Sequence, residues 1–125
     1  DRHKEVDQEW FKAALTKSID YCRERMPKFE YEVQVFRIGD FAIAGLAGEP
    51  FVEGQLAIKL ASPARQVMVA HCASHYAGYL PTRDAAARGG HEASEDYPYW
   101  AKLAPQSLDA VVEKTRAIIE EMFED

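Results

Sequence analysis

The sequence has few cysteines and no excess of positive charge. Its two cysteines, Cys22 and Cys72, lie in apolar patterns without a C-x-x-C spacing, so we expect buried thiols rather than a disulfide or a zinc ribbon. Lys and Arg number 15 against 21 Asp and Glu, which gives a net charge of −6. A protein that binds nucleic-acid phosphates needs a basic surface, so this composition argues against a nucleic-acid partner.

Long apolar runs and phosphate-binding glycine motifs are also missing. The longest apolar run, from Phe41 to Ala47, is far shorter than the roughly 20 residues that a membrane-spanning helix needs. The sequence contains no P-loop, no Gly-x-Gly-x-x-Gly turn and no Gly-x-Ser-x-Gly elbow. The chain begins with Asp1 rather than Met, so we expect that a tag, a processed leader or a larger N-terminal region has been removed.

Apolar periodicity predicts a helix near each end of the chain. Hydrophobic residues make up 47% of the 125 residues, enough for the core of one domain. From residue 6 to residue 26, apolar side chains such as Phe11, Leu15 and Ile19 recur every three or four positions, which predicts a helix with one buried face. Pro27 ends this helix. After Pro105 the same pattern predicts a second amphipathic helix.

The region between these helices alternates strand and helix signals. Residues 31–35 alternate as in a half-buried strand, and the continuous apolar run 41–46 is typical of a strand covered on both faces. Gly39-Asp40 suits a tight hairpin turn between them. A helix is expected from Pro50 to about Ala61, followed by a third, central strand over 67–73.

The segment from Ser74 to Ala104 shows little regular pattern beyond a helical turn or two at residues 83–88. An irregular segment of this length is unusual in a small domain unless it lines a site or packs against other structure. The sequence therefore predicts an α/β fold, organised as a single domain over residues 1–125. We expect a small mixed sheet of about three to four strands, one crossover helix and flanking N- and C-terminal amphipathic helices.

Glu49 is the most informative candidate for a functional residue. It follows a buried strand and comes directly before a helix, where open α/β sheets place their ligand-binding groups. The alternative is structural, because a carboxylate at the start of a helix is stabilised by free N–H groups and by the helix dipole. Sequence position alone leaves both interpretations open.

Histidines and tyrosines supply further candidates. His71 and His75 would lie on one face of the third strand and could share a metal site, or either could be an ordinary core or loop histidine. His91 lies in the irregular segment and could be a solvated turn residue. Aromatic residues cluster after the third strand, where such side chains usually fill a loop core or an interface: Tyr76, Tyr79, Tyr97, Tyr99 and Trp100.

Three stretches are informative when they are read together: the turn Gly45-Leu46-Ala47-Gly48-Glu49-Pro50-Phe51, the strand through Ala73, and the run from Tyr76-Ala77-Gly78-Tyr79-Leu80-Pro81-Thr82 to Gly89-Gly90-His91-Glu92-Ala93-Ser94. Together they resemble the later part of the catalytic domain of the neutral/alkaline, non-lysosomal ceramidase family. The resemblance covers residues 41–94, a little under half of the chain, and is closest to divergent bacterial relatives. It is carried by the order and spacing of these motifs.

The resemblance implies roles for three residues. Glu49 falls on the zinc-binding glutamate of the family, and Tyr79 falls on the tyrosine that completes the zinc site. His91 stands where the family usually has a tyrosine that steadies the oxyanion, so oxyanion stabilisation would pass to an imidazole N–H. The other two zinc ligands are histidines from a more N-terminal part of the domain, outside this chain, and neither His71 nor His75 matches them.

The function implied by the resemblance is zinc-dependent hydrolysis of a lipid amide, of the N-acylsphingosine kind, to an amine and a fatty acid. The chain would be the C-terminal segment of this enzyme, inactive alone and partnered by the N-terminal part of the parent protein. An alternative is a non-catalytic, stand-alone α/β domain that binds a partner or forms a homo-oligomer. A third interpretation is a self-sufficient metal site made of Glu49, His71, His75 and His91.

Overall fold

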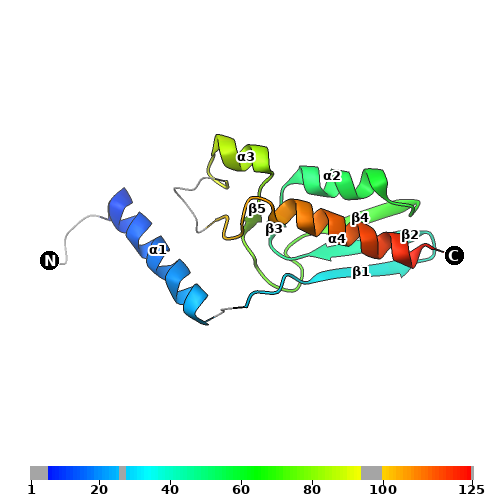
Figure 1. The fold of residues 1–125 in the computed structure, drawn as a ribbon, viewed down its shortest axis with the longest axis horizontal. Coiled ribbons are helices and arrows are strands. Elements are labelled where there is room, and N and C mark those ends of the chain that lie inside the picture. The colour runs from blue at the N-terminus through cyan, green and yellow to red at the C-terminus, as the bar shows by residue number, and fades with distance from the viewer. Residues whose placement is uncertain (1–5, 26–27, 94–99, 125) are drawn as a thin grey trace.

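The computed structural model describes residues 6–25, 28–93 and 100–124, and this part of the chain contains two small sheets (Figure 1). The larger is a three-stranded mixed sheet, and the smaller is a parallel pair of two-residue strands. The larger sheet has the order β1-β2-β4, with β1 at Val33–Ile38, β2 at Phe41–Leu46 and β4 at Gln66–Ala70. The smaller pairs β3 (Glu49–Pro50) with β5 (Tyr79–Leu80). The predicted α/β fold with a mixed sheet is confirmed.

Four helices lie in the described residues: α1 (Gln8–Arg25), α2 (Val52–Ala61), α3 (Arg83–Arg88) and α4 (Ser107–Met122). The predicted terminal helices, the crossover helix and the short helix over 83–88 are all present. Helix α2 begins two residues later than predicted because Pro50 lies in β3. Phe51 donates its backbone N–H to the Leu80 carbonyl at 3.0 Å, which keeps this segment extended before the helix starts.

The predicted hairpin and crossover are both observed. Strands β1 and β2 are antiparallel, Ile38 pairs with Phe41, and Gly39 in the turn has a φ of 59°. Strands β2 and β4 are parallel and are joined through α2. The crossover therefore uses α2 as its connecting helix, as the sequence predicts.

The core lies between the sheet and the two helices α2 and α4, which cover the same face (Figure 1). Ala42 and Leu46 of β2 point into it with Ile58 of α2 and Ile119 of α4. Thr115 is also fully buried in α4, where its hydroxyl donates to the Val111 carbonyl at 2.7 Å. Its polar group is therefore satisfied, as burial requires.

The opposite face of the sheet is uncovered, which corrects two expectations. Strand β2 is not covered on both faces, because Phe41 is 44% exposed. Strand β4 is an edge strand rather than a central one, and its Met68 is 63% exposed. Both strands look fully buried in the sequence because their outward-facing residues are apolar as well.

Helix α1 stands apart from the sheet and its helices (Figure 1). Leu15 is buried, but Trp10, Phe11 and Tyr21 on the same helix are exposed, so the expected burial of its apolar face is only partly realised. In the described part of the chain, no helix combines the length and the apolar character required to cross a bilayer.

Candidate functional site

The smaller sheet brings Glu49 and Tyr79 side by side. The two residues are register partners in the parallel pair of β3 and β5, and Glu49 donates its backbone N–H to the Gly78 carbonyl at 2.9 Å. Neighbouring strands lie about 4.8 Å apart, and register partners project their side chains to the same side of a sheet. The carboxylate and the phenol therefore leave the backbone from adjacent points and in the same direction.

Two glycines allow the strands to come this close. A Cβ atom on Gly48 would lie 2.3 Å from the Gly78 carbonyl oxygen, and a Cβ atom on Gly78 would lie 2.6 Å from the Trp100 carbonyl oxygen. Both glycines also have positive φ angles, 67° and 83°. Tyr79 donates its backbone N–H to the Trp100 carbonyl at 2.6 Å, so three chain segments are stacked around β5.

Tyr76 also interacts with Glu49. Partial burial raises the pKa of the Tyr76 phenol, and the charge of the Glu49 carboxylate and a hydrogen bond with it raise that pKa further. Tyr76 is 46% exposed, and the Lys102 ammonium lies 5.2 Å from the centre of its ring. The sequence predicts an aromatic cluster that includes Tyr76 but no role for it beside Glu49, because the loop conformation that brings Tyr76 to the carboxylate has no periodic signal.

The same carboxylate acts on Tyr79. The pKa of the Tyr79 phenol is raised, and desolvation is the largest cause. A hydrogen bond with Glu49 is the second cause, and the negative charge of Glu49 is the third. The Glu92 charge raises the same pKa to a smaller extent. A single carboxylate thus faces two phenols, and Glu92 lies close enough to add to the negative potential.

His91 lies next to this group through an aromatic contact. Its ring centre is 5.6 Å from that of Trp100, and Trp100 is in turn 6.4 Å from Tyr79 in an edge-to-face arrangement. Phe51 packs against Tyr79 in the same manner, with ring centres 6.5 Å apart. The structure therefore gathers Glu49, Tyr79 and His91, the three residues singled out by the resemblance, around one aromatic cluster.

Tyr97 and Tyr99, which the sequence analysis assigned to the same aromatic cluster, lie outside the described residues. The side chain of Cys22 is also outside the described part of the structure. The predicted roles of these three side chains stay predictions. Trp100 is the last member of the predicted cluster, and its contacts with Tyr79 and His91 place it in the site.

The segment that follows β4 differs from the prediction. The strand ends at Ala70 rather than Ala73, and Cys72 and Ser74 adopt positive φ angles of 55° and 63°. Side chains after Ala70 therefore no longer alternate between the two faces of the sheet, and the prediction that His71 and His75 lie on one strand face is wrong. Hydrogen bonds to the β2–β3 connection hold this segment, including one from the Cys72 N–H to the Gly48 carbonyl at 2.6 Å.

Cys72 is a free, exposed thiol rather than a buried one, which corrects the expectation for this cysteine. Its sulfur lies 4.0 Å from Nδ1 of His71. His75 instead stacks edge to face on Phe29, with ring centres 5.3 Å apart, and its buried Nε2 atom has no hydrogen-bond partner among the residues that the structure describes. The two histidines thus have different neighbours.

The described residues contain no group of three or more His, Cys, Asp or Glu side chains that could hold a metal ion. The interpretation of Glu49, His71, His75 and His91 as a self-sufficient metal site is therefore wrong. Glu49 and Tyr79 remain a pair of adjacent oxygen donors. Structural and catalytic zinc sites use three or four protein ligands, so this pair fits half of such a site.

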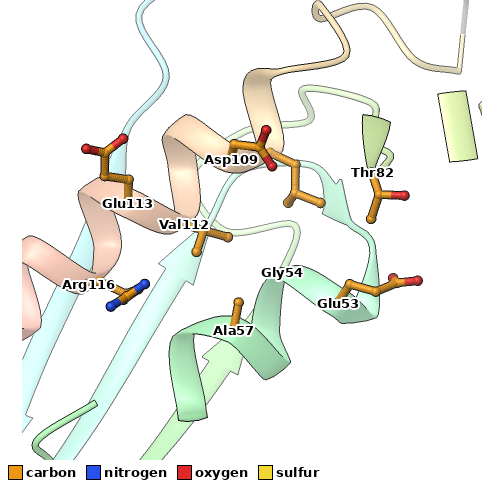
Figure 2. A pocket seen from close by; sticks show the side chains of 9 residues that line it. Glu53, Gly54, Ala57, Thr82, Asp109, Val112, Glu113 and Arg116 are labelled. Carbon is orange, nitrogen blue, oxygen red and sulfur yellow. The ribbon is translucent and has the colours of Figure 1, made fainter. Parts of the chain in front are cut away.

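A separate groove of about 580 Å³ lies between α2 and α4 (Figure 2). Ala57 of α2 and Val112 of α4 lie between the two helices, and Glu53, Asp109 and Arg116 contribute polar groups at the rim. Glu49, Tyr79 and His91 do not line this groove. It is therefore a distinct feature rather than a part of the candidate site.

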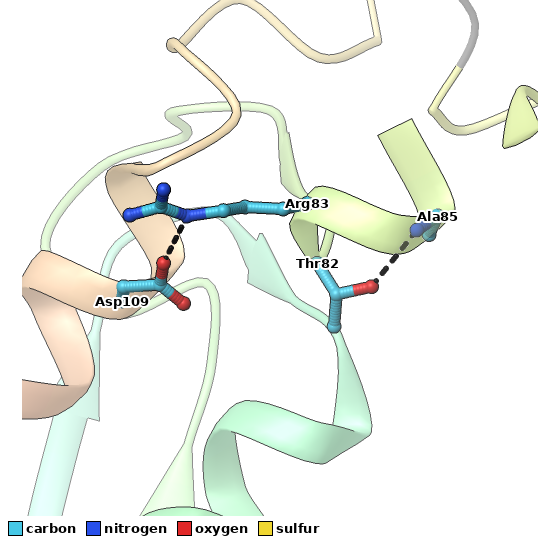
Figure 3. Close-up of polar contacts among 4 residues, drawn as sticks. All are labelled: Thr82, Arg83, Ala85 and Asp109. Carbon is cyan, nitrogen blue, oxygen red and sulfur yellow. Dashed lines mark hydrogen bonds and ion pairs between the residues drawn. The ribbon is translucent and has the colours of Figure 1, made fainter. Parts of the chain in front are cut away.

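Helix α3 is attached next to this groove (Figure 3). The Thr82 hydroxyl accepts a hydrogen bond from the Ala85 N–H at 3.0 Å and so caps the helix. Nε of Arg83 donates to a carboxylate oxygen of Asp109 at the start of α4, and both side chains are mostly exposed. An exposed ion pair contributes little stability, so the cap is the main local constraint on α3.

The candidate site is thus built from the turn between β2 and β3, from β5, from His91 and from the segment that begins at Trp100. Glu49 and Tyr79 are in register, Tyr76 faces the same carboxylate, and His91 is linked through Trp100. Comparison with known proteins adds no family assignment: no protein-family model, no curated protein and no solved structure matches this chain.

Proposed function

We propose that this chain is the C-terminal segment of a zinc-dependent amide hydrolase of the ceramidase type, acting on a lipid amide. The observation that supports this most directly is the register pairing of Glu49 with Tyr79. Two ligand oxygens on one zinc ion each lie about 2.0–2.2 Å from the metal. Side chains leaving adjacent strands about 4.8 Å apart can converge to that spacing.

The remaining zinc ligands would come from the N-terminal part of the parent protein. The pair supplies two of the three or four protein ligands that zinc requires, and the described residues bring no third candidate ligand to it. Helix α2, which begins three residues after Glu49, carries exposed apolar side chains on its outer side: Val52, Leu56 and Leu60. An apolar stripe beside an incomplete site is what a further layer of the same protein would cover.

When bound with one position open, zinc lowers the pKa of a coordinated water to about 7 and so supplies hydroxide at neutral pH. This chain's own residues have three tasks. Glu49 and Tyr79 would be ligands of the ion, and the Tyr76 hydroxyl would donate a hydrogen bond to the Glu49 carboxylate and so orient it. His91, which packs against Trp100, would donate a ring N–H to the carbonyl oxygen of the substrate, where a donor contributes roughly 3 kcal/mol to the transition state.

A non-catalytic α/β domain that binds a partner or a second copy is the alternative. The uncovered sheet face, where Phe36, Phe41 and Met68 are exposed, favours an interaction role. Such a role does not require Glu49 and Tyr79 to be adjacent. Substitutions at Glu49 and Tyr79 would therefore impair a hydrolase but not a binding domain.

The test is hydrolysis of an N-acylsphingosine by the complete product of the gene that encodes this chain, with zinc content measured in parallel. We expect Glu49→Gln and Tyr79→Phe each to lower both bound zinc and kcat/KM at least a hundredfold. Glu53→Gln and Tyr21→Phe are matched controls, because both side chains are exposed and lie outside the site. Full activity in Glu49→Gln, or a gene that encodes nothing upstream of this chain, would contradict the proposal.

A further inference from the structure

The uncovered face of the three-stranded sheet carries a cluster of apolar side chains, with the exposed Gln34 and Gln66 at its margins. We call it the open sheet face and define it by five side chains that share one side of the sheet: Phe36, Ile38, Phe41, Ile43 and Met68. Phe36, Ile43 and Met68 form one row across the three strands, and Ile38 lies beside Phe41 in the next. Except for Ile43, which is partly buried, these side chains are 44% to 63% exposed.

Exposure of such a face is unusual for this type of sheet. Strands β2 and β4 are parallel, and parallel sheets are normally covered by helices on both faces. Here α2 and α4 cover one face only (Figure 1). The missing layer on the other face is therefore expected to be helical.

Helix α1 has the complementary surface. Trp10, Phe11 and Tyr21 lie within a third of a turn of one another around the helix and are 48% to 57% exposed. At 1.5 Å per residue its 18 residues span about 27 Å, and a six-residue strand spans about 20 Å. One copy of α1 is long enough to cover the open sheet face from end to end.

Residues 29 and 31, which precede β1, are held by contacts with the rest of the domain. The Tyr31 hydroxyl donates to the Ala47 carbonyl at 2.6 Å, and Phe29 stacks on His75. These contacts fix the chain on the core side and at the edge of the sheet, and only residues 26 and 27 separate α1 from Lys28. Figure 1 shows the result, with α1 projecting clear of the sheet that it precedes.

We propose that α1 of one copy of this chain packs on the open sheet face of a second copy, and that the exchange is reciprocal. Without the partly buried Ile43, four side chains on the sheet and three on α1 each expose on the order of 100 Å², so the exchange would bury roughly 700 Å² per partner. That is close to the roughly 800 Å² per partner of a standard interface. A reciprocal exchange of identical elements closes with twofold symmetry and leaves neither surface exposed.

Light scattering on the size-separated chain tests this directly. We expect a mass twice the 14.1 kDa of one chain. Phe36→Lys on the sheet and Phe11→Lys on α1 are each expected to give a monomer with an unchanged far-ultraviolet circular dichroism spectrum, since both side chains are exposed. Leu60→Lys is the matched control, because Leu60 is the most exposed of the large apolar residues and lies on neither surface. It is expected to stay dimeric.

Mixing the two monomeric variants separates an exchange from other modes of association. A pair of Phe11→Lys and Phe36→Lys chains contains one intact α1 and one intact open sheet face, so the mixture should regain part of the dimer. The proposal would be overturned if the wild-type chain were monomeric, or if the Phe11→Lys and Phe36→Lys variants each stayed dimeric. It would also be overturned if the mixture of the two variants stayed monomeric. Met68→Lys gives a second test of the sheet surface if Phe36→Lys changes the spectrum. None of these outcomes depends on zinc or on hydrolysis.

Discussion

Glu49 and Tyr79 are register partners on two parallel strands, although a helix, a strand and a loop separate them in the sequence. Each strand is only two residues long. The pair is held by the backbone hydrogen bond from Glu49 to Gly78 and by the packing of two glycines against neighbouring carbonyl groups. The adjacency of Glu49 and Tyr79 therefore depends on this backbone arrangement, with the rings of Phe51 and Trp100 packed against Tyr79.

Removing the Glu49 charge should lower the pKa values of both neighbouring phenols. Glu49 raises the pKa of Tyr76 and of Tyr79 through its charge and its hydrogen bonds, although desolvation is the largest cause for each. In Glu49→Gln we therefore expect both pKa values to fall part of the way toward 10. Absorbance titration of phenolate formation measures the shift, with Glu53→Gln as the control. Phenol titrations identical to wild type would show that the carboxylate is not beside the two rings.

A methyl group on Gly48 should destabilise the fold more than the same group on Gly39. Both glycines have positive φ angles, which costs a side chain about 1–2 kcal/mol. A Cβ on Gly39 meets nothing within 4 Å, whereas on Gly48 it would lie 2.3 Å from a backbone oxygen. We expect Gly39→Ala to lower the free energy of unfolding by about 1–2 kcal/mol and Gly48→Ala by roughly 3 kcal/mol or more. Urea denaturation compares them, and equal losses would argue against the close approach of β3 and β5.

Tyr31 should make stability depend on pH in the alkaline range. Burial raises its pKa from the ordinary value of 10 to about 12, so the folded state favours the protonated phenol. Its contribution is complete below pH 10 and is lost as the pH rises through 12. Tyr31→Phe also loses the hydrogen bond to Ala47 and should cost about 1 kcal/mol at neutral pH. The difference between the two proteins should shrink from pH 10 upward in urea denaturation, and a constant difference would contradict this.

The larger elements were predictable because each has a periodic or turn signal. The apolar spacing of Leu108, Val111, Thr115 and Ile119 places one buried face on α4, and Gly39-Asp40 gives the hairpin. Strands β3 and β5 have no such signal, since two residues are too few for alternation to show. Glu49 and Tyr79 were identified as a pair through the resemblance, and their adjacency depends on close backbone contacts that a sequence pattern does not encode.

Errors in the sequence analysis have a common physical origin in surfaces that are apolar but uncovered. The runs that contain Phe41 and Met68 look like central strands because their outward positions are as hydrophobic as their inward ones. Trp10 and Phe11 widen the apolar stripe of α1, yet both are exposed. Cys72 was expected to be buried because it lies within the apolar run 67–73, but the strand ends at Ala70 and Cys72 is exposed, with a positive φ.

A double-mutant cycle on zinc affinity tests the central claim that Glu49 and Tyr79 share one ion. Because the described residues supply only two ligands, we expect the wild-type chain to bind zinc with a dissociation constant above about 1 μM. Competition with a chromophoric chelator can measure an affinity in this range. Glu49→Gln and Tyr79→Phe should each weaken it, and the double variant should be little worse than either single one, because the losses are coupled through the same metal. Strictly additive losses, or an affinity unchanged by both substitutions, would show that the two oxygens do not hold a common zinc ion.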